Sequence, residues 1–246
     1  MQNSNFIISR NKSIVPALDV PTIEKMVEVV DATRTVPGVG GYKLGFSLAL
    51  RYGLPRLVHA IRTLSDKPII YDHQKAATDI PDTGRDFALA CKESGVDAVI
   101  LFPQAGPETL KAWIKAAQEN NLKIIVGLEM THPAYLQKDG GFLSDESPRR
   151  ILDIALQAGV REFVVPGNKP QKILEYRQLI EQSGLQDGEF CFHSPGLVTQ
   201  GGEISESAKA AGARWHAIIG RALYSLSSKE EMRAAAEKYA AALLQA

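Results

Sequence analysis

The sequence predicts an α/β protein built as one (β/α)8 barrel of the TIM type, a single domain spanning residues 1–246. Its length is close to the roughly 250 residues typical of that fold. Short apolar runs alternate with longer amphipathic segments about eight times, the pattern of parallel strands covered by crossover helices. Charged or polar residues follow many of the apolar runs, and no linker, repeat or low-complexity tract suggests a second domain.

Each predicted strand is a short run rich in Val, Ile, Leu or Phe, and each predicted helix fills the gap that follows it. The strands are expected at 14–18, 41–44, 68–71, 98–102, 123–128, 162–165, 189–192 and 216–219. The helices are expected at 24–35, 48–64, 83–94, 107–120, 147–158, 169–183, 205–211 and 229–244. Gly95, Gly159 and Gly184 are predicted to end helices, whereas Ser147 and Ser228 are predicted to cap helix starts.

Composition excludes several classes of partner. The chain has 28 basic and 28 acidic side chains, so no overall field favours nucleic acid or an anionic membrane. The N-terminal apolar run is too short for a signal peptide, and no stretch approaches the roughly 18 apolar residues of a membrane span. We therefore expect a cytoplasmic protein. Cys91 and Cys191 lie far apart without a C-x-x-C pattern, which predicts neither a disulfide framework nor a thiolate metal site.

Polar residues follow the predicted strands on the side where a barrel of this kind places its active site. Asp19 follows the first strand, Lys43 lies at the end of the second, and Asp72 follows the third, with Lys75 and Asp79 behind it. Residues 129–132, His193-Ser194 and Gly220-Arg221 follow later strands. Charges crowded at strand ends shift one another's pKa values and can act on a substrate. A ring of salt bridges closing the barrel rim is the structural alternative.

The last two strands are followed by a pattern typical of phosphate binding. The stretch 194–203 contains three glycines, which let backbone N–H groups approach an anion closely. Arg221 follows the eighth strand and can hold a phosphate through two hydrogen bonds. After the fifth strand, residues 129–142 form the longest irregular stretch, which is either a mobile lid or an idle loop.

Taken in order, these motifs resemble the orotidine 5′-phosphate decarboxylase family over essentially the whole chain. The resemblance is carried by 17–19, 42–45, 79–83, 130–133, 195–196, 200–202 and 219–224. It implies conversion of orotidine monophosphate to uridine monophosphate in pyrimidine biosynthesis, by a carbon–carbon lyase that needs no metal or organic cofactor.

The resemblance also implies roles for individual residues. The catalytic set is Lys43, Asp72, Lys75 and Asp79, and the substrate-binding set is Asp19, Ile80, Thr83, Thr131, Pro195, Gln200, Gly220 and Arg221. Asp19 would bind the ribose, Thr131 the pyrimidine, and Gln200, Gly220 and Arg221 the phosphate. Asp79, Ile80 and Thr83 would reach the partner's site across a homodimer.

One departure from the family lies in the charged segment itself. The family signature is Asp-x-Lys-x-x-Asp, whereas this chain has Asp72-x-x-Lys75-x-x-x-Asp79. Residues of an extended strand alternate between faces, so Asp72 and Lys75 would point in opposite directions unless a bulge or an early turn intervenes. Alternatively, His73 or Gln74 takes over part of the role of Lys75 in the charged cluster.

Two other functions are compatible with the sequence. Related barrels of the same superfamily decarboxylate or isomerise keto-sugar phosphates with Mg²⁺, and Asp72, His73, Glu129 and His193 could supply ligands. Lys43 argues against that function, because an ammonium repels a divalent ion. The second alternative is a barrel that binds a nucleotide phosphate but has lost catalysis, which the altered spacing around Lys75 suggests.

Overall fold

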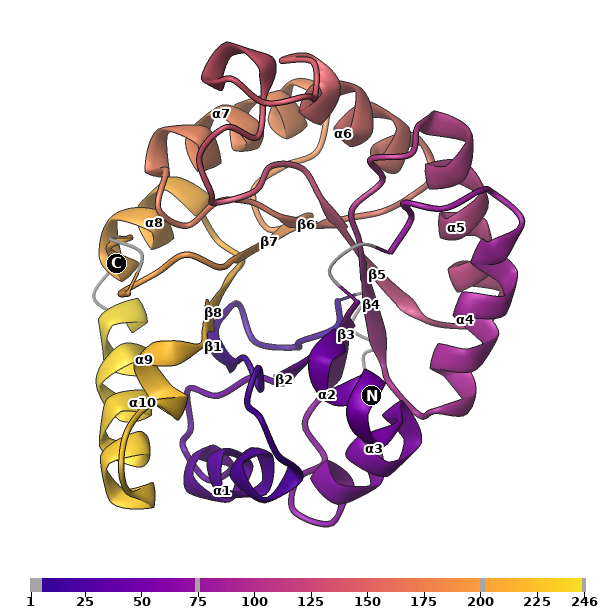
Figure 1. Ribbon diagram of the computed structural model, residues 1–246. Helices are drawn as coiled ribbons and strands as arrows, with labels where there is room; N and C mark the ends of the chain where they lie inside the picture. Colours follow the sequence, from indigo (N-terminus) through magenta and orange to yellow (C-terminus); the bar gives the residue numbers. More distant parts are fainter. Residues whose placement is uncertain (1–5, 74–75, 200–201, 245–246) are drawn as a thin grey trace.

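A computed structural model describes residues 6–73, 76–199 and 202–244 of the chain. Within them, eight parallel strands lie side by side in the order β1-β8-β7-β6-β5-β4-β3-β2, and a ring of helices surrounds them (Figure 1). The strands are β1 Lys12–Pro16, β2 Tyr42–Gly45, β3 Ile69–Asp72, β4 Ala98–Leu101, β5 Lys123–Gly127, β6 Glu162–Val164, β7 Cys191–Ser194 and β8 Trp215–Ile219. The backbone N–H of Leu18 donates to Lys43 O at 2.8 Å, which links β1 to β2 and closes the barrel. The predicted (β/α)8 barrel is confirmed.

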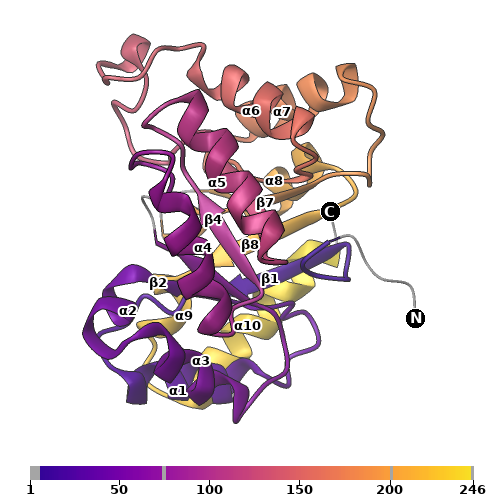
Figure 2. The same cartoon turned by 90° about the vertical axis from the view of Figure 1, so that its right-hand side faces the viewer.

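The helices occupy the predicted gaps, with two differences. They are α1 Ile23–Thr33, α2 Phe46–Tyr52, α3 Leu54–Arg62, α4 Thr83–Glu93, α5 Pro107–Glu119, α6 Ser147–Gln157, α7 Pro170–Gln182, α8 Ile204–Ala211, α9 Arg221–Tyr224 and α10 Lys229–Leu244. The helix predicted over 48–64 is two helices, because Gly53 adopts φ +77°, which a helix cannot continue through. The short helix α9 was not predicted. The side view in Figure 2 shows α4 and α5 packed next to each other along the barrel wall.

Most of the predicted helix ends are confirmed. Gly95, Gly159 and Gly184 have positive φ values and follow α4, α6 and α7. Ser228 Oγ accepts from the N–H of Glu231 at 3.2 Å at the start of α10. Ser147, however, is the first residue of α6 rather than its cap, and the cap position belongs to Glu146.

The barrel interior has an apolar middle and polar ends. Val15, Ile70, Ile100, Ile125 and Ile218 belong to a buried cluster inside the strands, whereas the larger core lies between strands and helices. Because β7 begins at Cys191, two residues later than predicted, His193 lies within the strand and not beyond its end. Polar residues therefore enter the interior near the amino ends of the strands as well as at their carboxyl ends. No helix of the described residues is long and apolar enough to span a membrane.

Candidate active site

A cavity of about 310 Å³ opens at the carboxyl ends of the strands. Seven of the twelve residues predicted from the sequence line it: Asp19, Lys43, Asp72, Thr131, Pro195, Gly220 and Arg221. They come from loops or strand ends after β1, β2, β3, β5, β7 and β8. The fold thus brings together side chains that are up to about 200 positions apart in the sequence, as the active-site face of this fold does.

The Lys43 ammonium is the electrostatic centre of the cavity. Its Nζ donates to Asp72 Oδ2 at 2.9 Å and to Asp19 Oδ2 at 3.1 Å, and the residue is only 4% exposed. Burial alone would lower the pKa of Lys43, but the carboxylates of Asp72 and Asp19 outweigh it and raise the pKa above its ordinary value. Lys43 therefore stays charged while it holds both carboxylates toward the cavity.

Alternation along the neighbouring strands sets this geometry. Tyr42 and Leu44 face the helices, so Lys43 between them faces the barrel interior. Gly45 pairs with Asp72 in the β2–β3 register. A Cβ on Gly45 would lie 1.9 Å from Asp19 Oδ1, so only glycine leaves room there for the carboxylate.

The segment after β3 departs from a regular strand at once. His73 turns away from the cavity: its Nδ1 lies 2.6 Å from the Tyr71 hydroxyl and its ring meets Phe87 edge-on. Lys75, the predicted proton donor, lies outside the described residues, as does Gln74. Beyond them, Ala77 adopts φ +67°, a left-handed conformation that is uncommon for alanine. Ala76 O accepts from Phe102 N at 2.8 Å, which fixes the loop to the end of β4.

Asp79, Ile80 and Thr83 do not line the cavity. Asp79 and Ile80 border a surface groove between the β3–α4 loop and the start of α5, and Ile80 is 59% exposed. The loop is anchored there, because Thr109 Oγ1 donates to Asp79 O at 2.8 Å and Trp113 Nε1 donates to Ile80 O at 3.1 Å. Within one chain, the predicted cluster is therefore divided between the cavity and this groove.

The predicted phosphate-binding loops meet at the mouth of the cavity. Val198 N donates to Gly202 O at 2.9 Å, and Leu197 pairs with Gly202, so the loop after β7 folds back on itself. Gln200 and Gly201 lie outside the described residues. Arg221 is exposed and begins α9 directly after Gly220, which places a guanidinium beside the cavity.

Sequence reasoning missed the apolar wall of the cavity and the partners of Glu129. Ile100, Phe102, Met130, Val164, Leu197, Ile218 and Tyr224 all line the cavity. Strand alternation was the signal that could have identified Ile100, Val164 and Ile218 as inward-facing. Glu129 also lines the cavity, where it accepts from Lys169 Nζ and from the Tyr176 hydroxyl, each at 2.8 Å.

The four residues considered as magnesium ligands are not brought together. Asp72 and Glu129 line the cavity. His73 packs against aromatic rings outside it. His193 Nε2 lies 2.8 Å from Glu162 Oε2, near the amino end of the barrel.

The chain is similar in sequence to known proteins over most of its length. Residues 12–239 match the family described as Orotidine 5'-phosphate decarboxylase / HUMPS. The chain is 33% identical over 238 residues to the orotidine 5'-phosphate decarboxylase of Methanosarcina acetivorans, covering 96% of this chain and 98% of that protein. It is 31% identical over 224 residues to the enzyme of the same name from Methanosarcina mazei, covering 91% and 93%.

Solved structures show the same architecture. Orotidine 5'-monophosphate decarboxylase from Methanocaldococcus jannaschii, complexed with the inhibitor BMP, superposes with a TM-score of 0.80 at 26% identity and covers 95% of this chain and 99% of its own. The orotidine 5'-phosphate decarboxylase of Pyrococcus horikoshii gives a TM-score of 0.76 at 25% identity, covering 94% and 99%. The chain belongs to the orotidine 5'-phosphate decarboxylase / HUMPS family.

Proposed function

We propose that this protein is a cofactor-free lyase that decarboxylates orotidine 5′-monophosphate to uridine 5′-monophosphate in pyrimidine biosynthesis. The family match and the named relatives support this reaction. The observation that carries it is the Asp19–Lys43–Asp72 set, in which one buried ammonium holds two carboxylates at the floor of the cavity. Such fixed charges can act on a substrate whose own charge changes during the reaction.

Asp72 would face the C6 carboxylate of the substrate. Two like charges about 4 Å apart repel by roughly 4 kcal/mol at an effective dielectric constant of 20. The repulsion disappears when the C6–carboxylate bond breaks and CO₂ leaves, with the electron pair remaining on C6. Lys75 would stabilise that pair and donate a proton to C6, while Lys43 and Asp79 hold the Lys75 ammonium in place.

The rest of the cavity would bind the nucleotide. Asp19 would accept hydrogen bonds from the ribose, Thr131 would bind the pyrimidine edge, and Pro195 would line the site. Gln200, Gly220 and Arg221 would bind the phosphate, for which the exposed Arg221 guanidinium at the cavity mouth gives support. Closure of the loops around Thr131 and Gln200 would use phosphate binding to accelerate chemistry at the distant ring.

We also propose a homodimer in which Asp79, Ile80 and Thr83 complete the partner's site. Asp79 and Ile80 lie on the surface of their own chain, outside the cavity. Large apolar side chains are exposed on the adjacent elements: Phe46, Leu50, Ile80 and Leu89. A set of this kind is typical of a surface that binds another protein.

The reaction is tested by following the absorbance of orotidine monophosphate with purified protein. We expect a loss of pyrimidine carboxylate absorbance that a chelator does not prevent. Lys75→Ala should abolish turnover with little change in uridine monophosphate affinity. Binding of uridine monophosphate without turnover by the parent protein would identify the non-catalytic barrel, and activity lost with a chelator would identify the magnesium-dependent alternative.

Sharing of Asp79 across a dimer has its own test. Lys75→Ala and Asp79→Asn should each be inactive alone. Mixed dimers would contain one site with both residues intact, so unfolding and refolding the two variants together should restore roughly a quarter of the parent activity. A mixture that stays inactive although the parent is dimeric by light scattering would place Asp79 in its own chain's site.

A further inference from the structure

A second set of polar side chains lies inside the barrel near the amino ends of the strands. This closed-end cluster consists of Ser13, Glu162, Cys191, His193 and His216. Glu162 is 4% exposed and the other four are fully buried. Barrel interiors of this fold are ordinarily filled by branched apolar side chains. Five polar side chains in that space therefore need partners of their own.

Each histidine of the cluster is held by one ring nitrogen only. His193 Nε2 lies 2.8 Å from Glu162 Oε2, and His216 Nδ1 lies 2.8 Å from Ser13 Oγ. The opposite nitrogens, His193 Nδ1 and His216 Nε2, are buried and have no hydrogen-bond partner among the residues that the structure describes. Buried polar atoms are rarely left unpaired, so these two nitrogens indicate that the cluster accommodates a further group.

Three donor atoms of the cluster are already gathered, and Glu162 adjoins them through His193. Cys191 Sγ and one nitrogen from each of the two imidazoles lie within 4.8 Å of one another. Cys191 Sγ is 4.0 Å from His193 Nε2, and the two ring centroids are 5.0 Å apart. In a tetrahedral zinc site such donors are separated by about 3.4 to 3.6 Å, as bond lengths of about 2.0 to 2.3 Å require. Shifts of roughly 1 Å would bring them around an ion.

We infer that Cys191, His193 and His216, with Glu162 as fourth donor, form a structural zinc site at the closed end of the barrel. Thiolate, imidazole and carboxylate together suit Zn²⁺, whereas Mg²⁺ and Ca²⁺ prefer oxygen alone. One thiolate and one carboxylate also balance the charge of the ion, which matters at a buried position. The sequence argued against a thiolate site because Cys91 and Cys191 lie far apart without a C-x-x-C pattern, but neighbouring strands supply histidines beside Cys191.

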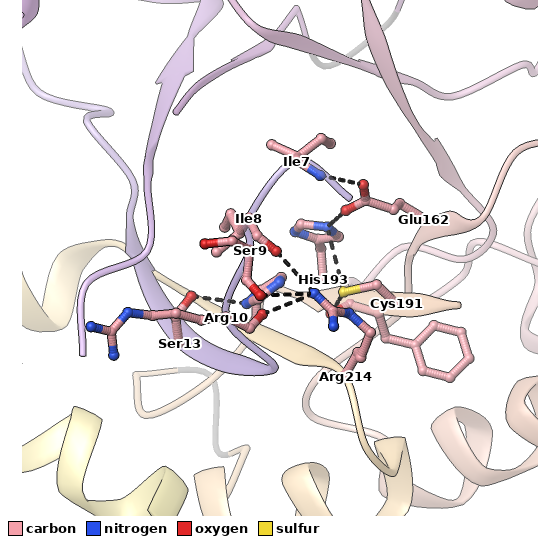
Figure 3. Close-up of polar contacts among 11 residues, drawn as sticks. Ile7, Ile8, Ser9, Arg10, Ser13, Glu162, Cys191, His193 and Arg214 are labelled. Carbon is pink, nitrogen blue, oxygen red and sulfur yellow. Dashed lines mark hydrogen bonds and ion pairs between the residues drawn. The ribbon is translucent and has the colours of Figure 1, made fainter. Parts of the chain in front are cut away.

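The N-terminal segment covers this site. Figure 3 shows Ile7 to Arg10 lying beside the cluster, with Ile7 N donating to Glu162 Oε1 at 2.8 Å. Arg214 fastens the segment: its Nη2 donates to the carbonyl oxygens of Ile8, Ser9 and Arg10 at 3.1 to 3.3 Å. Zinc would therefore enter before this segment docks, so that loading accompanies folding.

Metal loading during refolding tests the site. The protein is unfolded in denaturant that contains a chelator, freed of metal, and refolded with Zn²⁺ or Co²⁺. We expect one equivalent of zinc to remain after gel filtration and Tm to rise by about 5 to 10 °C at saturating zinc. Cobalt should give a thiolate-to-metal charge-transfer band in the near ultraviolet. The rate of decarboxylation should be the same with and without zinc below Tm.

Variants locate the ion. Cys191→Ser should lose the charge-transfer band, and His216→Gln should weaken zinc binding at least about tenfold. Cys91→Ser is the matched control, since Cys91 is the other buried free thiol, and should behave as the parent. Less than about a tenth of an equivalent of zinc on the refolded parent would overturn the inference, a result that does not depend on any variant folding. So would zinc retained by both Cys191→Ser and His216→Gln, or binding of copper without zinc.

Discussion

The two ends of the barrel interior both hold polar side chains, but they differ in access to solvent. At the open end, the carboxylates on Lys43 have side-chain exposures of 32% for Asp19 and 14% for Asp72. At the closed end, His193 and Glu162 have side-chain exposures of 0% and 5%. An apolar layer that includes Val15, Ile100 and Ile218 lies in the barrel interior between the two ends. The same fold therefore places one polar cluster where a substrate can reach it and another that is buried away from solvent.

The largest expected effect is at the open end. Lys43→Met removes the cation that holds Asp19 and Asp72, so kcat/KM should fall by at least about 10²-fold, as loss of one preorganised electrostatic group does. Decarboxylation is measured by absorbance. Lys111→Met, on the surface of α5, should stay within twofold of the parent. A Lys43→Met enzyme with parental activity would contradict the role given to the open end.

The closed end should respond in stability and not in catalysis. Glu162→Ala leaves two buried nitrogens, Ile7 N and His193 Nε2, without an acceptor. The free energy of unfolding should fall by about 2 to 4 kcal/mol, measured by urea denaturation. The kcat of the folded variant should stay within twofold. Glu162→Gln keeps an acceptor oxygen and should be affected less, and a large loss of kcat in either folded variant would show that the two ends are coupled.

Arg221 tests binding at the mouth of the open end. Because its guanidinium is exposed, Arg221→Ala should leave stability nearly unchanged. Loss of a charge-assisted phosphate contact should weaken uridine monophosphate binding by about 10- to 100-fold in calorimetry. Arg85→Ala, exposed on α4, serves as the control. Equal affinities of Arg221→Ala and the parent would show that the phosphate does not bind at this loop.

The smallest effect concerns His73, which lies outside both polar ends. Burial lowers the pKa of His73 below its ordinary value, against the opposing effect of Asp72. The unfolded chain therefore binds a proton more readily, and the stability associated with neutral His73 is present above about pH 6.5 and lost as pH falls below it. His73→Gln should lose less stability than the parent between pH 7 and pH 5 in urea titrations. Identical pH profiles would refute this assignment.

Much of the fold followed from the sequence, because parallel strands buried on both faces are nearly continuous apolar runs. Residues such as Asp19 and Lys43 could be predicted as neighbours, because strand ends converge at one face of a barrel. The path from Asp72 to Asp79 could not, since it depends on Ala77 adopting a left-handed conformation that its residue type disfavours.

The closed-end cluster was also missed, and for a different reason. His193 was predicted to lie beyond its strand and His216 to begin one, yet both lie within strands and face inward. Their neighbours Phe192 and Trp215 are large and apolar and pack against the helices. The histidines alternate along their strands with these large apolar side chains, and this alternation was the available signal that they face inward. The interaction of Glu162 with His193, however, depends on β6 and β7 lying side by side, which only the assembled barrel provides.

The hydrogen bonds between Arg214 and the N-terminal segment also bear on the order in which the chain folds. These bonds join residues as many as 206 positions apart, and those of His216 and Glu162 span 203 and 155 positions. Closing loops of that length is entropically costly and slow, so such contacts form after the local ones. The segment that covers the closed end precedes β1 in the chain and is made before all eight strands, but it can dock only after β8 exists. We expect it to be the first part of the barrel to leave the ribosome and the last to reach its native position.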